Sequence, residues 1–92
     1  MSAFDERMAE LRAHFLERAA AQRAELEAAL AAGEREEIRR IAHSLAGSGG
    51  VFGFPRVSED AQAVEEAVDA GPGDEELKSI AAQLLKRLRD LA

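Results

Sequence analysis

Apolar residues recur every three or four positions along most of this chain, which is the spacing of one buried face on an α-helix. Three breaks that contain glycine or proline interrupt the pattern, at Gly33, at residues 53–55 and at residues 70–73. No segment shows the alternation of β-branched and polar residues that is typical of strands. The pattern therefore predicts four helices, over residues 4–32, 34–52, 55–70 and 74–91.

The first predicted helix is the longest of the four, and one polar residue, Gln22, interrupts its apolar stripe. Gly33 suits the position just after this helix, where the backbone commonly turns left-handed. The stripe consists of Phe4, Met8, Leu11, Phe15, Ala19, Leu26 and Ala29 or Leu30. Four amphipathic helices with short links predict an all-α fold, an antiparallel up-down four-helix bundle with a long first helix, as one domain of residues 1–92.

His43 lies in the second predicted helix, away from that helix's apolar stripe. At about 100° per residue, its side chain points roughly 140° away from that of Ile38. The stripe itself consists of Ile38, Ile41, Ala42, Leu45, Gly49 and Phe52. A histidine of the core would lie on this stripe, so we expect the imidazole of His43 to face solvent.

Three glycines follow His43 inside the same helical pattern, and each costs about 1 kcal/mol relative to alanine in a helix. Gly49 falls on the apolar stripe, where it can allow close packing of a neighbouring helix. Gly47 and Gly50 fall on the outer face, where packing gives no reason for them. An alternative is that the helix ends at Leu45 and a flexible loop follows. The unbroken phase of the stripe favours a continuous helix that leaves a flat surface beside His43.

The surroundings of His43 suit the transfer of a phosphoryl group. Arg39 and Arg40 stand one turn before it, and Gly47 stands one turn after it. A neutral imidazole offers one nitrogen lone pair, which can attack an acyl phosphate. The chain contains no P-loop, no kinase glycine-rich loop and no acidic cluster arranged for Mg²⁺. A partner would therefore have to supply the metal and most of the catalysis.

The residues around His43 resemble the histidine-containing phosphotransfer (HPt) domain family. The signature of that family, His-x-Leu-Lys-Gly-Ser-Ser, corresponds to His-Ser-Leu-Ala-Gly-Ser-Gly at residues 43–49. Gly53 and the segment 57–65 are also similar to the family pattern. The similarity covers most of the chain and is specific over residues 39–65.

The resemblance implies a phosphorelay intermediate of two-component signalling, phosphorylated on His43, that neither binds ATP nor phosphorylates itself. It implies that the partners are receiver domains of response regulators or of a hybrid histidine kinase. We expect no cofactor in this chain, because the receiver would supply Mg²⁺. The lysine that the family carries three residues after the histidine is Ala46 here. We expect Arg39 or Arg40 to replace its charge and, with Gly47, to surround the phosphoryl group.

Contacts to the partner are predicted at residues that flank His43 or follow the glycine segment. Phe54 is included on the condition that its ring is exposed, as an apolar docking contact. The predicted docking residues are Ser44, Ala46, Gly50 and Phe54.

The composition narrows the classes of partner and compartment. The net charge of −6 and the absence of Trp and Tyr disfavour a nucleic-acid-binding protein. No apolar run approaches the roughly 20 residues that span a membrane, and residues 1–10 do not resemble a signal peptide. With no cysteine in the chain, we expect a cytoplasmic protein without a cysteine-bound metal. Because the bundle uses the one stripe of each helix, we expect a monomer.

Two other functions remain open at this point. A helical adaptor could bind receiver domains without phosphotransfer, and the loss of the family lysine at Ala46 is the feature that favours it. An enzyme with His43 as general base would need a pocket and a second group to orient the ring. A convex helix face that bears only Ala and Gly does not supply these, so we expect an enzyme least. His14, the other histidine, is expected at the boundary of the first helix's stripe. No spacing of ligands around either histidine predicts a metal site.

Overall fold

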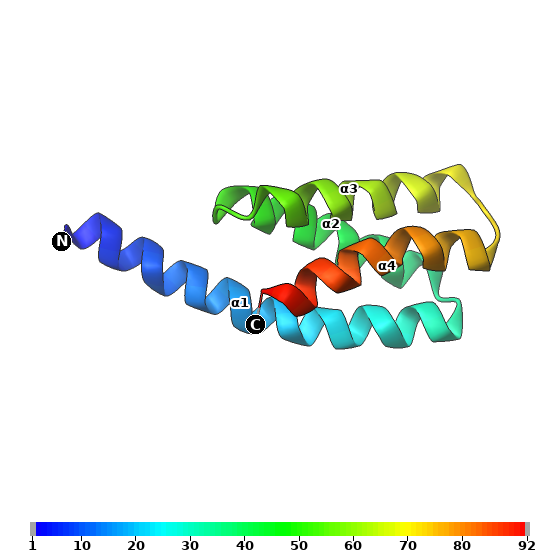
Figure 1. Cartoon of the computed structure of the whole chain (residues 1–92), viewed down its shortest axis with the longest axis horizontal. Coiled ribbons are helices and arrows are strands. Elements are labelled where there is room, and N and C mark those ends of the chain that lie inside the picture. Colours follow the sequence, from blue (N-terminus) through cyan, green and yellow to red (C-terminus); the bar gives the residue numbers. More distant parts are fainter. Residues whose placement is uncertain (1, 92) are drawn as a thin grey trace.

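The computed structural model describes residues 2–91, so Met1 and Ala92, the ends of the predicted domain, lie outside the described residues. This part of the chain forms four helices and no strand. The helices are α1 (Ala3–Ala32), α2 (Arg35–Val51), α3 (Pro55–Ala70) and α4 (Asp74–Asp90). They run alternately up and down (Figure 1), which confirms the predicted all-α antiparallel bundle. Each observed bound lies within one residue of the predicted one.

Local sequence signals explain where the helices begin and end. Ser2 and Asp5 form a reciprocal capping box at the start of α1, in which each side chain accepts a hydrogen bond from the other residue's backbone N–H. Gly33 and Gly71 follow α1 and α3 with φ angles of 69° and 72°, a left-handed conformation that glycine adopts without strain. Pro55 occupies the first turn of α3, where its missing N–H would have no helical partner.

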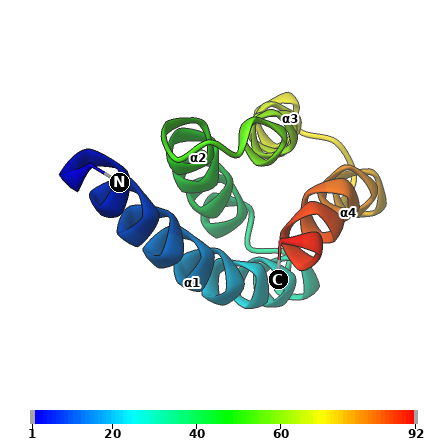
Figure 2. The same cartoon turned by 60° about the vertical axis from the view of Figure 1, so that its left-hand side comes forward.

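The four helices surround a common axis (Figure 2), and their buried apolar residues form one core between them. Fully buried leucine and isoleucine side chains come from three of the helices: Leu26 from α1, Ile41 and Leu45 from α2, and Leu84 from α4. Val57, Ala61 and Val64 add the buried face of α3. The most extensive interface joins α2 to α3, and the smallest joins α1 to α4. The helix that carries His43 is therefore held chiefly by α3.

The glycine segment of α2 is helical, so the alternative of a flexible loop after Leu45 is wrong. The helix continues through all three glycines to Val51. A Cβ atom at Gly49 would lie 3.1 Å from the backbone nitrogen of Ser58 and 3.2 Å from the carbonyl oxygen of Phe54. Gly49 therefore lets α2 and the start of α3 approach more closely than any other residue would allow.

Two polar pairs connect helices at the border of the core. The amide of Gln22, the polar interruption in the α1 stripe, donates a hydrogen bond to Ser44 Oγ of α2 at 3.1 Å. Arg87 of α4 donates to the carboxylate of Asp60 on α3 at 2.8 Å. Gln22, which interrupts the apolar stripe of α1, and the partly buried Asp60 thus each have a partner on a neighbouring helix.

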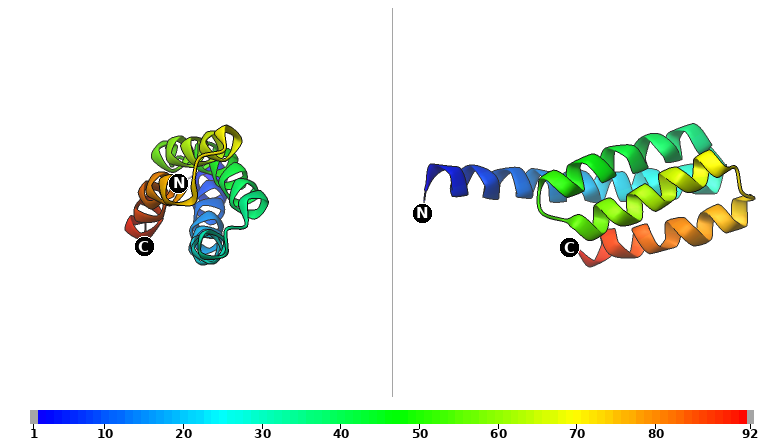
Figure 3. Two further views of the ribbon diagram at one scale, coloured as in Figure 1. Left: turned by 90° about the vertical axis from the view of Figure 1, so that its right-hand side faces the viewer. Right: turned by 90° about the horizontal axis from the view of Figure 1, so that it is seen from above.

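The N-terminal part of α1 projects beyond the other three helices (Figure 3). A helix of 30 residues is about 45 Å long at ~1.5 Å per residue, whereas the other helices reach little more than half of that. Near the point where the projection starts, Arg12 Nε donates to the carbonyl oxygen of Phe52, at the end of α2, at 3.2 Å. Phe4 is therefore 72% exposed, and Met8 and Leu11 are only half-buried. The assignment of Phe4 to a buried stripe was wrong, and that of Met8 and Leu11 holds only in part.

None of the helices within residues 2–91 combines the length and the apolar character that crossing a membrane requires.

Candidate functional site

His43 stands on the outer face of α2, opposite the buried residues Ile38, Ile41 and Leu45. Its side chain is 73% exposed, as the helical phase predicts. The imidazole is therefore accessible to another protein, and the packed side of α2 fixes the backbone that carries it.

A carboxylate from the neighbouring helix holds one nitrogen of the ring. Glu65 of α3 places its Oε2 atom 2.9 Å from Nδ1 of His43, and the Glu65 side chain is only 18% exposed. Because a carboxylate only accepts hydrogen bonds, a hydrogen bond between Glu65 and a neutral ring requires the ring proton on Nδ1. In that form of the ring, Nε2 carries the lone pair.

Sequence reasoning did not assign this role to Glu65. The residue appeared only as part of the segment 57–65 that resembles the HPt pattern, and the face around His43 was expected to lack a group that orients the ring. The orienting group comes from another helix, so no spacing within α2 could have indicated it. The conclusion that such a group is missing was wrong.

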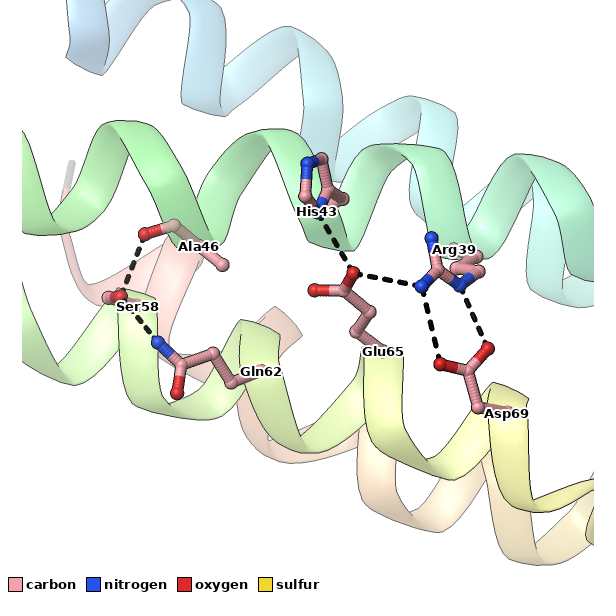
Figure 4. Close-up of polar contacts among 7 residues, drawn as sticks. All are labelled: Arg39, His43, Ala46, Ser58, Gln62, Glu65 and Asp69. Atoms are coloured by element: carbon pink, nitrogen blue, oxygen red, sulfur yellow. Dashed lines mark hydrogen bonds and ion pairs between the residues drawn. The ribbon is translucent and has the colours of Figure 1, made fainter.

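Arg39 lies one turn before His43 on the side that faces α3 (Figure 4). Its Nη2 atom is 3.3 Å from Oε2 of Glu65. Its Nε and Nη2 atoms also donate to the two oxygens of Asp69, at 2.8 and 3.3 Å. The hydrogen bond from Arg39 lowers the pKa of the Asp69 carboxyl below its ordinary value, and Asp69 raises the pKa of the guanidinium.

Arg40 lies on the opposite side of His43, toward α1. Its Nε donates to Glu37 at 3.0 Å, its Nη2 also contacts Glu37, and Nη2 is 3.7 Å from the carboxylate of Glu25 on α1. The hydrogen bond from Arg40 lowers the pKa of Glu37. The two predicted phosphate-surrounding arginines thus flank the ring on opposite sides, each held by carboxylates.

Beyond His43, toward the end of α2, the helix surface is nearly bare. Apart from its two chain neighbours and the nearby backbone of α2 itself, no heavy atom lies within 4 Å of the position that a Cβ of Gly47 would take. Gly50 is exposed as well. A shallow surface recess follows this side of α2, lined by His43, Ser44, Gly47, Ser48, Val51 and Phe52.

Val51 adds an apolar contact to this surface that sequence reasoning missed. Its side chain is 69% exposed, and it lies eight residues, about two helical turns, after His43. The signal was present in the sequence, because a β-branched apolar residue on the outer face of a glycine-rich helix has no packing role.

The predicted docking residues have different surroundings. Ser44 is half-buried with its hydroxyl turned to Gln22 of α1, and Ala46 is half-buried toward α3, where its carbonyl oxygen accepts from Ser58 Oγ at 2.7 Å. Phe54 is half-buried and stacks on Phe15, with ring centroids 4.8 Å apart. The premise that Phe54 is exposed is therefore wrong, and its ring belongs to the end of the core.

The second histidine lies apart from this arrangement. His14 is exposed on α1, further out than the boundary position expected for it. Within residues 2–91, no three His, Asp or Glu side chains gather in a group that could hold a metal ion.

Comparison with known proteins agrees with this picture. The family model described as Hpt domain matches residues 10–92. No curated protein and no solved structure matches the chain.

Proposed function

Since this chain belongs to the Hpt domain family, and so has a phosphotransfer role in two-component signalling with receiver domains as partners, we propose that His43 is its phosphoryl carrier. His43 takes the phosphoryl group from the aspartate of one receiver and passes it to another. The observation that carries the proposal is the exposed imidazole whose Nδ1 is held 2.9 Å from the Glu65 carboxylate. The chain acts as a carrier and not as a kinase.

The first half of the reaction uses the lone pair of Nε2. As the N–P bond forms, the P–O bond to the receiver aspartate breaks, and that aspartate leaves as a carboxylate. The phosphorylated ring keeps its Nδ1 proton and gains a positive charge. The carboxylate of Glu65, on the other side of that proton, stabilises the charge as it develops.

The second half reverses these steps with a different receiver. Its aspartate attacks the phosphorus atom, the N–P bond breaks, and the imidazole leaves as a neutral ring with the proton still on Nδ1. No external acid or base is required in either direction. The Mg²⁺ that phosphoryl transfer needs for charge neutralisation belongs, in this proposal, to the receiver.

We assign the cation on this chain's side of the phosphoryl group to Arg40. The family lysine is replaced by Ala46, whose side chain is half-buried and uncharged. Arg40 is 57% exposed, and its partners are surface carboxylates. Exposed ion pairs of this kind contribute little to stability, so the guanidinium can exchange Glu37 for an arriving phosphoryl oxygen.

The bare surface of α2 receives the partner. Gly47 and Gly50 allow the other protein to approach the helix backbone closely, and Val51 offers an apolar contact at the end of the recess. Ser44 and Ala46 border this surface without projecting from it.

The test is phosphotransfer from a receiver domain that carries a radiolabelled phosphoryl group on its aspartate. The wild-type chain should acquire a label that is labile in acid and stable in base. His43→Ala should acquire none, whereas His14→Ala, which removes the other exposed histidine, should be labelled like the wild type. A label that persists in His43→Ala contradicts the proposal.

The same experiment decides between a carrier and an adaptor. If the wild-type chain and His43→Gln bind the receiver with equal affinity and neither exchanges phosphate, the chain is a helical interaction domain. If only the wild type is labelled while both bind, the carrier function stands.

A further inference from the structure

Four charged or polar side chains form a ladder between α2 and α3 beside the candidate phosphorylation site. Arg39 and His43 stand four residues apart on α2, and Glu65 and Asp69 stand four residues apart on α3. Residues with this spacing lie on one face of a helix. The two pairs face each other, and every neighbouring step of the ladder is a hydrogen bond or ion pair (Figure 4).

We propose that Arg39 is a positioning residue for phosphotransfer: held by Asp69, it fixes the Glu65 carboxylate against Nδ1 of His43 and does not contact the phosphoryl group. This inference rests on the proposed function of His43. It assigns Arg39 a role other than replacing the family lysine, and it adds Asp69 to the site.

A single oxygen of Glu65 carries both contacts. Oε2 lies 2.9 Å from His43 Nδ1 and 3.3 Å from Arg39 Nη2. With its side chain 18% exposed, Glu65 has lost most of its contact with water and needs protein donors for its charge. Without Arg39, the carboxylate would keep one donor and would be free to rotate away from the ring.

Asp69 determines where the guanidinium lies. It receives two hydrogen bonds from Arg39, through Nε and Nη2, and such a two-point contact fixes the plane of the guanidinium as well as its position. With one N–H of Nη2 directed to Asp69, its other N–H is free to point toward Glu65. Asp69 therefore acts on the imidazole through two intervening side chains.

The same contacts explain why Arg39 is a poor candidate for the phosphoryl group. Moving to a phosphoryl oxygen on Nε2 would break the contact to Glu65 and both hydrogen bonds to Asp69. It would also release the group that keeps the proton on Nδ1. Arg40 has no contact with the ladder, because its partners are Glu37 and Glu25, so it can move without disturbing the ring.

The decisive measurement is the tautomer of His43 in the unphosphorylated protein, read from the ¹⁵N chemical shifts of its ring. In the wild type, the Nδ1–H form should dominate. Arg39→Ala should raise the fraction of the Nε2–H form and slow single-turnover transfer from a phosphorylated receiver by roughly tenfold, the lower end of the loss that follows when a metal-bound histidine loses its orienting partner. Asp69→Asn should change both quantities in the same direction by a smaller factor.

Two further variants isolate the route through Glu65. In a Glu65→Gln background, Arg39→Ala should have no additional effect on the tautomer, because the charge that Arg39 holds is gone. Arg40→Ala, the matched loss of a neighbouring arginine, should leave the tautomer unchanged. Circular dichroism establishes for each variant that the helices are intact.

Two results would overturn the inference. One is an unchanged tautomer in Arg39→Ala together with faster loss of phosphate from His43, which would make Arg39 a phosphoryl contact. The other is faster transfer in Asp69→Asn, which would mean that Asp69 restrains Arg39 from the phosphoryl group. If the wild type is never labelled, the proposed function fails, but the tautomer measurements still decide whether Arg39 positions the ring.

Discussion

Gly47 and Gly49 stand two residues apart on the same helix and have opposite surroundings. At Gly47 a Cβ atom would meet nothing within 4 Å, whereas at Gly49 it would lie 3.1 Å from a backbone nitrogen and 3.2 Å from a carbonyl oxygen. Neither glycine has a positive φ angle, so the backbone conformation of α2 requires neither. The reason for each glycine must lie in what approaches it.

The approaching group is present for only one of them. The start of α3 occupies the space next to Gly49, and this contact belongs to the most extensive helix interface in the bundle. The space next to Gly47 is solvent in the isolated chain, so a glycine there lowers helix stability by about 1 kcal/mol without a compensating internal contact. The comparison indicates that Gly49 serves the fold, and under the proposed function Gly47 serves a partner.

Replacing Gly47 with leucine should give the largest effect on function. The new side chain would stand between His43 and the docking surface of the receiver, and displacing reacting atoms by about 1 Å can slow a reaction ~100-fold. The free energy of unfolding should rise by up to about 1 kcal/mol, because leucine is a much better helix former than glycine. Single-turnover phosphotransfer and urea unfolding measure the two quantities. If this variant transfers phosphate at the wild-type rate, the approach of a partner does not explain the glycine at position 47.

Replacing Gly49 with valine should produce the reverse. Its side chain would press on the backbone of Phe54 and Ser58, and overpacking of this kind lowers the free energy of unfolding by about 2 kcal/mol. For a domain of this size, the melting temperature should fall by roughly 8–16 °C. Transfer, measured well below the melting temperature, should remain within about twofold of wild type, since the folded population stays dominant. A variant as stable as the wild type would show that α3 does not need the close approach.

The face on which each glycine lies could be predicted from the sequence, because the helical period relates every residue of α2 to the buried stripe. The same reasoning placed His43 in solvent and Gly49 in the core. It succeeded there because both conclusions depend on one helix only.

Conclusions that depend on two helices could not be reached in this way. The contact between Glu65 and His43 requires the register of α3 against α2, which no periodicity contains. Phe4 lies on the same stripe as Phe15, and only the shorter lengths of the other helices leave it uncovered. Phe54 follows the glycine segment in the sequence, but the turn at Gly53 folds its ring back onto Phe15.

A substitution at Ser58 tests the packed interface between α2 and α3 with a smaller change than Gly49→Val. Its hydroxyl donates to the carbonyl oxygen of Ala46 at 2.7 Å and accepts from Gln62 at 3.3 Å, and the residue is buried. Ser58→Ala should lower the free energy of unfolding by about 1 kcal/mol, the usual contribution of one hydrogen bond at a buried site. Phosphotransfer should not change, because Ser58 is a buried residue of α3 and does not lie on the exposed face of α2 that carries His43. A loss of transfer without a loss of stability would place Ser58 among the functional residues instead.

The surroundings of Gly50 are intermediate between those of Gly47 and Gly49, and a substitution there should have the smallest effect on stability and transfer. It is exposed like Gly47, but a Cβ atom there would make an ordinary contact of 3.7 Å with Ser58 Oγ. Gly50→Ala should therefore raise the free energy of unfolding by about 0.5–1 kcal/mol, the usual gain from removing a glycine from a helix. Transfer should slow by less than in Gly47→Leu, because one methyl group near α3 covers little of the surface beside the imidazole. If Gly50→Ala instead loses stability as Gly49→Val does, then Gly50 belongs to the face of α2 that packs against α3, in spite of its exposure.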